Sequence, residues 1–336
     1  MSSGGHDLDD GDWKLLLERI AGKNCTPIVG LGAVTGGPPE GVGADKWNFQ
    51  YPISATLAQE WATEFKYPLE DATRLEHVAQ FIGVEYGQSL PKERIADQLA
   101  KTSPPDFTQE NETHRVLAGL NLPIYLTSNF DDYLVRALRA AEKDVRVSIC
   151  RWNKHIPQTA PAYDPDQRDL IPYAIAEEGE EPGTLAYNPE TNARYEPTPA
   201  SPLVYHFHGH MAWPASLVVT EDDYFEFLLN LAKASPSLIT PRIQRVFGAG
   251  SLLFLGYRLS DWDFRVLFRL LADYLKIPDY KHIAVQLGPM SGAQAADATK
   301  AAKAARYLGS YFGTRNIKVY WGTCQEFIAE LKRRRG

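Results

Sequence analysis

Residues 122–135 read LPIYLTSNFDDYLV, a short apolar run that turns polar halfway and then takes on helical character. The apolar half, 122–126, has the length and composition of a buried strand. The helix expected after it carries Asp131 and Asp132 in its first turn, where acidic groups are favoured by the helix dipole. Ligands of open α/β sheets bind where strands end, so the turn presents Asn129 and Asp131 at a potential binding edge.

The same order of strand, polar turn and helix recurs along the chain. Apolar runs predict strands at 26–29, 122–126, 145–149, 203–207, 251–255, 282–287 and 317–321. Helical periodicity predicts intervening helices at 13–20, 114–120, 131–141, 221–229, 242–247, 261–275, 291–308 and 323–331, with Thr220 and Ser260 as N-caps. Alternating strands and helices predict the α/β class, with a doubly wound, Rossmann-like parallel sheet.

Two segments interrupt this alternation within what we expect to be a single domain, residues 1–336. From about 53 to 120 the apolar residues keep a helical period, which predicts a helical insertion that caps the ligand site. From about 153 to 202 the chain is rich in proline and glutamate, which predicts an irregular excursion from the core.

Composition narrows the functional class. With 336 residues and 44% hydrophobic content the chain is expected to fold, and a net charge of -7 opposes general binding of polyanions. The basic run 332–335 is expected to be solvated. Three cysteines without a Cys-x-x-Cys pair provide neither a disulfide framework nor a four-thiolate zinc site, which favours a reducing compartment. No apolar stretch approaches the roughly 20 residues of a membrane span, so we expect a soluble, cytoplasmic protein.

Two further polar segments follow expected strands. Residues 30–37, GLGAVTGG, form a glycine-dense turn whose backbone amides could approach a phosphate closely. His206, His208 and His210 alternate after the run 203–205. On a strand all three imidazoles would share one face, as in the metal-binding His-x-His pairs of amidohydrolases, which is a rival enzyme class. Only His282 follows as a further ligand, so His206 and His210 are more readily interpreted as structural.

Four motifs stand in the order found in sirtuin-like proteins, and the chain resembles that family over most of its length. They are Gly30-Leu31-Gly32-Ala33, Thr127-Ser128-Asn129-Phe130-Asp131, His208-Gly209 and Gly256-Tyr257-Arg258-Leu259-Ser260-Asp261. The segments 220–224 and 317–321 are similar to those of the bacterial branch associated with anti-phage defence. Each motif alone is weak, and their shared order is what makes the resemblance specific.

The resemblance implies an NAD site, with NAD as substrate and no metal. Asn129 would position the ribose and the attacking water, and His208 would act as general base at the ribose hydroxyls. Asp131 would lie near the nicotinamide amide. The implied NAD-binding residues are Gly30, Leu31, Gly32, Ala33, Thr127, Asp131, Gly256, Tyr257 and Arg258. Arg258 stands where the family more often has Ser or Thr, so it either pairs with a phosphate or forms a surface or subunit salt bridge.

The implied activity is hydrolysis of NAD to nicotinamide and ADP-ribose, which would deplete NAD during anti-phage defence. A protein deacylase is the alternative within the family, although deacylating sirtuins carry a four-cysteine zinc module that this chain cannot supply. A catalytically silent scaffold that binds NAD or ADP-ribose is a third hypothesis. The resemblance also implies a homo-oligomer or a partner defence protein, such as an ATPase or a nucleic-acid-guided module.

Overall fold

The computed structural model describes residues 8–35, 49–53, 55–150, 152–153, 162–163, 170–171, 197–232, 250–257, 265, 268, 282–286, 298–314 and 316–336. Several expectations fall outside these residues. They are the helix at 242–247, nearly all of the helix at 261–275, Ser260, Arg258, the end of the glycine-dense turn and most of the proline-rich excursion.

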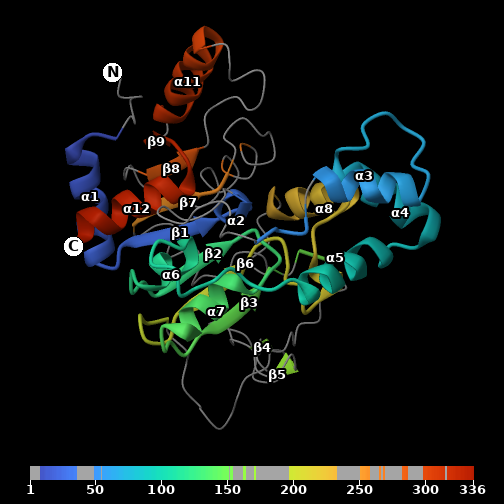
Figure 1. The fold of residues 1–336 in the computed structure, drawn as a ribbon, viewed down its shortest axis with the longest axis horizontal. Coiled ribbons are helices and arrows are strands. Elements are labelled where there is room, and N and C mark those ends of the chain that lie inside the picture. The colour runs from blue at the N-terminus through green and yellow to red at the C-terminus, as the bar shows by residue number, and fades with distance from the viewer. Residues whose placement is uncertain are drawn as a thin grey trace.

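In the described residues, seven strands form one parallel sheet in the order β3-β6-β2-β1-β7-β8-β9 (Figure 1). Their bounds are β1 Cys25–Val29, β2 Ile124–Thr127, β3 Arg146–Ile149, β6 Leu203–His206, β7 Ser251–Leu255, β8 His282–Gln286 and β9 Ile317–Trp321. The predicted doubly wound, Rossmann-like sheet is confirmed. The chain moves from β1 to β2 on one side and later returns to β7 on the other, so β1 lies at the topological switch point, where ligands of such folds bind.

Helices cover both faces of the sheet because successive strand residues point to opposite sides. Ile28 belongs to one apolar cluster with residues of α8 (Glu221–Ala232) and α11 (Ala298–Gly313), whereas its neighbour Val29 belongs to a second cluster on the other face. That second face is covered by four helices: α1 Asp10–Ala21, α6 Thr113–Ala118, α7 Tyr133–Ala140 and α12 Cys324–Arg335. Burial on both faces explains why the strands are nearly continuous apolar runs.

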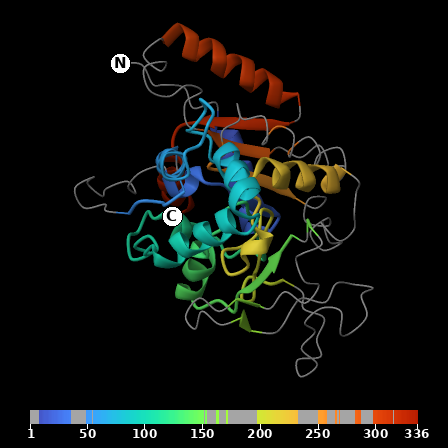
Figure 2. The same ribbon diagram turned by 90° about the vertical axis from the view of Figure 1, so that its right-hand side faces the viewer.

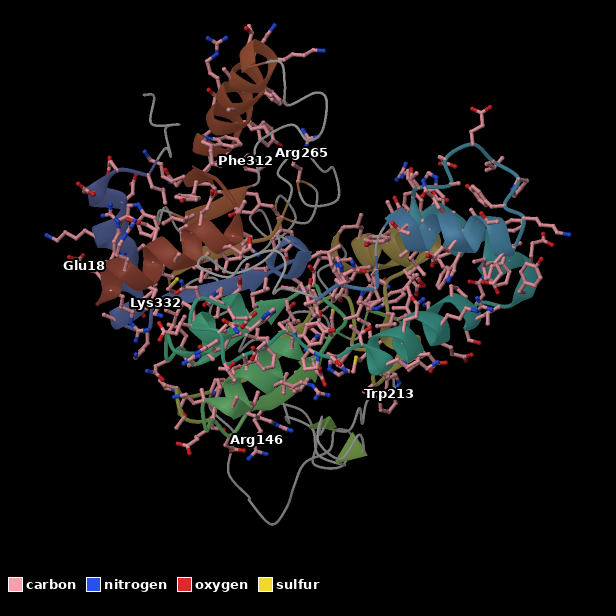
Figure 3. The ribbon with its side chains drawn as sticks, in the orientation of Figure 1. Glu18, Arg146, Trp213, Arg265, Phe312 and Lys332 are labelled. Atoms are coloured by element: carbon pink, nitrogen blue, oxygen red, sulfur yellow. The ribbon has the colours of Figure 1, made fainter. Side chains whose placement is uncertain are left out.

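The helices α3 (Ala55–Glu64), α4 (Leu75–Tyr86) and α5 (Leu90–Lys101) stand beside the sheet with α8, on the right of Figure 1 and facing the viewer in Figure 2. They share a third apolar cluster, which also takes in Tyr133 and Leu217 from the sheet region. The helix α6, which the sequence pattern grouped with them, packs on the sheet beside α7 instead. A short 3-10 helix, η1 (Pro214–Ser216), contacts α5 and directly follows Trp213, which is labelled in Figure 3.

The basic run at the end of α12 is largely exposed, as expected, and it also forms surface ion pairs. Lys332, labelled in Figure 3, forms an ion pair with Glu110 at 2.9 Å. Arg334 pairs with Asp10 at 2.9 Å and lies over the ring of Trp13. These basic groups therefore contact α1 and the segment before α6 at the surface, where such ion pairs contribute little to stability.

Local boundaries differ from the predictions at two functional turns. The helix expected from residue 131 begins at Tyr133, because the side chain of Asp131 accepts a hydrogen bond from the Tyr133 N–H and shapes the turn before it. The glycine-dense turn is not open throughout, since Gly32–Thr35 forms one helical turn, α2. Thr220 is confirmed as the N-cap of α8, because its Oγ1 accepts from the Asp223 N–H at 3.1 Å.

Within the proline-rich segment, β4 (Ala162–Tyr163) pairs with β5 (Leu170–Ile171) in antiparallel fashion. All three cysteines are buried and carry free thiols, at Cys25, Cys150 and Cys324. Among the helices of the described residues, none has the length and apolar character that crossing a bilayer requires.

Candidate functional site

Four neighbouring strands end level with one another at the carboxyl edge of the sheet. Val29, the last residue of β1, pairs with Thr127 of β2 on one side and with Leu255 of β7 on the other. Thr127 in turn pairs with His206, the last residue of β6. The four polar segments singled out in the sequence therefore leave the sheet side by side, although they are distant along the chain.

Backbone hydrogen bonds continue across these ends into the turns. The Ser128 N–H donates to the Val29 carbonyl oxygen at 3.0 Å, and the Phe207 N–H donates to that of Thr127 at 2.8 Å. On the other side the Gly30 N–H donates to the Leu255 carbonyl oxygen at 2.8 Å. The turns are thus fixed relative to one another by the same ladder that holds the sheet.

The glycine turn after β1 packs directly against the backbone after β7. The Gly32 N–H donates to the Gly256 carbonyl oxygen at 2.8 Å, and Gly256 has a φ of 76°, which side chains rarely tolerate. A Cβ on Gly256 would lie 2.2 Å from the Ala33 nitrogen. Only glycine fits this crossing of two backbones.

The amides of the glycine turn are largely engaged within the protein. Those of Gly30, Gly32, Ala33 and Val34 each donate to a carbonyl oxygen of the β7 end or of the turn itself. Leu31 is 41% exposed. The described part of the turn therefore offers a ligand a closely approachable backbone and one apolar side chain, and its contact with a phosphate stays a prediction.

Asn129 is buried, and its backbone is held on both sides. Its N–H donates to Thr127 Oγ1 at 3.0 Å, and that hydroxyl donates to the Val29 carbonyl oxygen. Its carbonyl oxygen lies 3.0 Å from His206 Nδ1. Because a carbonyl oxygen only accepts, Nδ1 of His206 must carry the proton. Burial and the nearby His210 lower the pKa of His206 well below its ordinary value, so the ring stays neutral.

Asp131 is also buried, with both carboxylate oxygens occupied by protein groups. Oδ2 accepts from the Tyr51 hydroxyl at 2.9 Å, and Oδ1 accepts from the Tyr133 N–H at 3.0 Å. Burial raises the pKa of Asp131, whereas the nearby His114 acts in the opposite direction. His114 is itself buried and bonded through Nδ1 to Glu112 at 2.7 Å. The contact of Asp131 with a nicotinamide amide stays a prediction.

His208 lies on a different side of its segment from its two neighbours. It is half-buried, and its ring packs edge-on against Tyr224 and Phe227 of α8, with centroids 5.7 and 5.0 Å away. Burial lowers the pKa of His208 to about 4. An imidazole in this setting is neutral near pH 7 and can accept a proton.

The three histidines do not share one strand face, as the metal-binding alternative would require, because β6 ends at His206. The ring of His210 folds back to within 4.6 Å of the His206 ring, and its Nδ1 accepts from the Ala212 N–H. Both flanking histidines thus fix the shape of the turn. Across the described part of the chain, no group of three or more His, Cys, Asp or Glu side chains is arranged to hold a metal ion.

A family model described as the SIR2-like domain matches residues 123–308, more than half of the chain. The chain belongs to the SIR2-like family. The match begins at β2, so it includes the turns that carry Asn129 and His208. The glycine turn after β1 lies before the matched region, yet it is hydrogen-bonded to the Gly256 segment within it.

Three curated relatives are each named NAD(+) hydrolase ThsA. The protein of Acinetobacter baumannii (strain 532279) is 22% identical over 207 residues, that of Cytobacillus dafuensis 25% over 207, and that of Enterococcus faecium 24% over 217. The matches cover 61%, 62% and 65% of this chain but only 33%, 32% and 35% of the respective relatives. The SIR2-like chain thus spans about a third of the length of each.

The residues predicted from the SIR2-like motifs are partly brought together. The turns with Gly30, Asn129, His208 and Gly256 begin at adjacent strand ends. Tyr257 bridges two of them, because its hydroxyl donates to Ser128 Oγ at 3.0 Å across the end of β1. Thr127 contributes through the hydroxyl that fixes Asn129, and Arg258 lies outside the described residues.

Sequence reasoning missed the groups that support these residues. Tyr51 and His114 surround Asp131, and α8 supplies the aromatic rings that shield His208. Tyr51 is 80 positions from its partner, so no local pattern marks the pair. Tyr224 and Phe227 are three positions apart, a spacing that places them on one side of a helix. Spacing alone gives no indication of what that side contacts.

Proposed function

We propose that this SIR2-like chain hydrolyses NAD to nicotinamide and ADP-ribose. The observation that carries the proposal is the level ending of β7, β1, β2 and β6, from which the glycine turn, Asn129 and His208 leave the sheet as neighbours. A dinucleotide laid across this edge would lie at the switch point of the sheet. The curated names of the three relatives support the same activity.

The chemistry requires breaking the bond between ribose C1′ and the nicotinamide nitrogen. The bonding electrons leave with nicotinamide, C1′ acquires oxocarbenium character, and a water molecule forms the new C1′–O bond while it loses one proton. Asn129 orients the ribose and the attacking water in this proposal, since its peptide is fixed by Thr127 and His206. His208 is assigned the proton, because its imidazole is neutral at pH 7 and leaves the sheet beside the turn of Asn129.

The biological setting is part of the proposal. NAD depletion in anti-phage defence, a cytoplasmic location, a homo-oligomer and control by an ATPase or a nucleic-acid-guided partner rest on the resemblance of motifs to the bacterial defence branch. Light scattering of the purified chain tests the oligomer. Measuring nicotinamide release with and without added candidate partners tests whether a partner regulates the activity.

The activity itself is tested by incubating the purified protein with NAD and quantifying nicotinamide by chromatography. The wild type should release nicotinamide, whereas Asn129→Ala and His208→Ala should lose roughly a hundredfold or more in kcat. Asn111→Ala, in the segment before α6, serves as the amide control and should retain activity. NAD binding without nicotinamide release, both alone and with partners, would favour the scaffold hypothesis.

A further inference from the structure

Three consecutive acidic residues at the start of α8 each contact one side chain of the helices α4 and α5. The contacts are Glu221 with His77 Nε2 at 3.2 Å, Asp222 Oδ2 with Gln80 Nε2 at 2.9 Å, and Asp223 Oδ1 with Lys92 Nζ at 2.7 Å. The Asp222 N–H also donates to Gln80 Oε1 at 3.0 Å. The first turn of α8 is therefore attached to the helical layer at three successive positions.

The contact between Lys92 and Asp223 differs from the other two in burial and connectivity. The side chains of Lys92 and Asp223 are 11% and 12% exposed, whereas that of Glu221 is 41% exposed. The second oxygen of Asp223, Oδ2, accepts from the N–H groups of Val219 and Thr220 at 3.0 Å each. One carboxylate thus closes the first turn of α8 and binds a lysine from α5.

Lys92 is also linked, through Trp152, to the segment that leads from His208 to α8. Its Nζ lies 5.2 Å from the centroid of the Trp152 ring, and the Trp152 Nε1–H donates to the Ser216 carbonyl oxygen at 2.7 Å. Ser216 Oγ in turn accepts from the His210 N–H at 2.9 Å. The lysine therefore contacts Asp223 in α8 directly and is linked to the histidine turn indirectly, through Trp152 and Ser216.

The position of α8 determines how well the His208 ring is shielded from water. Tyr224 directly follows Asp223, and Phe227 lies about one helical turn further on; both rings meet the imidazole edge-on. A small movement of the first turn of α8 would open this contact and admit water to the ring. Better hydration favours the charged form of an imidazole.

We propose that Lys92 is a positioning residue for His208, acting through Asp223 to hold Tyr224 and Phe227 of α8 against the imidazole. The catalytic meaning of this arrangement rests on the proposed function, in which His208 is the base. The packing relationship itself does not, and it can be measured without NAD.

The ion pair between Lys92 and Asp223 can hold α8 against His208 because it is directional and mostly buried. Removing the ammonium group leaves the Asp223 carboxylate without its partner in a poorly hydrated site, which forces that carboxylate toward solvent. Lys92→Met removes the charge and keeps most of the apolar stem. Lys92→Arg keeps the charge, and Lys101→Met changes an exposed lysine of the same helix as a control.

The test is a histidine titration followed by NMR on 13C-labelled protein, with the His208 signal identified by its loss in His208→Gln. The wild type and Lys101→Met should titrate with a pKa near 4, as burial dictates. Lys92→Met should titrate higher, toward the ordinary value of 6.5, and Lys92→Arg should stay near the wild type. An unchanged His208 titration in folded Lys92→Met would overturn the proposal.

A second measurement, hydrogen exchange of His208, is made at neutral pH and uses a different variant from the titration. Exchange of the His208 Cε1 hydrogen at neutral pH, read by mass spectrometry, should be slow in the wild type and faster in Asp223→Asn, which loses the charge but keeps an amide oxygen for the cap. Equal exchange in both would contradict the proposed positioning. A role in stability alone would lower the melting temperature and leave the exchange rate of His208 unchanged.

Nicotinamide release separates this inference from the proposed function. If the wild type releases nicotinamide, Lys92→Met should lower kcat roughly tenfold to a hundredfold with little change in KM, because the base is displaced rather than removed. If the wild type releases none under any condition, the proposed function fails, while the titration still decides whether Lys92 positions His208.

Discussion

His206 donates its Nδ1–H to the carbonyl oxygen of Asn129 over 3.0 Å, and so joins the turn after β6 to the turn after β2. The two residues are 77 positions apart. Both are buried, so water cannot readily replace the bond. The orientation of the Asn129 peptide therefore depends on a histidine that the sequence analysis interpreted as structural.

Replacing His206 tests this bond. His206→Leu should destabilise the protein by about 1–3 kcal/mol, because the Asn129 carbonyl loses a buried partner. Nicotinamide release should fall as well. His206→Gln, whose amide can donate a hydrogen bond, should retain more of both. Denaturant unfolding and nicotinamide assays would measure the effects, and equal behaviour of the two variants would argue against the bond.

The backbone crossing of Gly32 and Gly256 predicts that Gly256→Ala is poorly tolerated. The substitution combines a positive φ with a Cβ 2.2 Å from the Ala33 nitrogen, so a loss of about 1–3 kcal/mol or more is expected. NAD should also bind more weakly. Gly313→Ala is the matched control, since a Cβ there meets nothing within 4 Å. Similar melting temperatures for the two variants would contradict the crossing.

The hydroxyl of Tyr51 is predicted to stabilise the buried Asp131 carboxylate. Tyr51→Phe removes one of its two hydrogen bonds and should cost about 1–3 kcal/mol of unfolding free energy. It should also raise KM for NAD by loosening the turn that follows Asn129. Tyr307→Phe, at a largely exposed tyrosine, should be neutral. The idea fails if calorimetry finds both variants as stable as the wild type.

The depressed histidine pKa values predict a loss of stability in mild acid. Burial lowers the pKa of His210 to about 3 and that of His282 to about 4. In the unfolded chain both would take up a proton near 6.5, so the unfolded state binds more protons between that pH and the folded pKa. Stability is therefore fully present above pH 6.5 and falls toward pH 4, by up to about 1.4 kcal/mol per pH unit for each histidine.

Urea unfolding between pH 7 and pH 5 measures how steeply the free energy of unfolding falls as the pH is lowered. His282→Gln should make this fall shallower, because one of the titrating groups is removed. Nicotinamide release should remain steady over the same pH range while the protein stays folded, since His208 is already neutral. A stability that rises on acidification would contradict the assigned directions.

The sequence predicts the sheet well because strands and helices are local patterns. The runs that end at Val29, Thr127 and Leu255 are apolar on both faces, as central parallel strands must be, and their polar turns mark the carboxyl edge. The order of the strands in the sheet, and the register that aligns their carboxyl ends, could not be obtained from periodicity. They depend on pairing between segments that are distant along the chain.

The supporting contacts of the site were beyond the sequence for the same reason. Lys92 and Asp223 are 131 positions apart, and a lysine on an amphipathic helix is ordinarily assigned to the solvent. The metal-binding alternative placed His208 on the face of His206 only on the condition that the strand continues. The strand ends one residue after Tyr205, and the turn carries His208 to α8 instead.

The central claim is that Asn129 and His208 act on the same bond of the same NAD molecule. Its most direct test is kcat for nicotinamide release by the wild type, Asn129→Ala, His208→Ala and the double variant. Residues that act together lose their effect together, so the double variant should be about as slow as the slower single variant. Losses that multiply, or single variants that keep wild-type kcat, would contradict it.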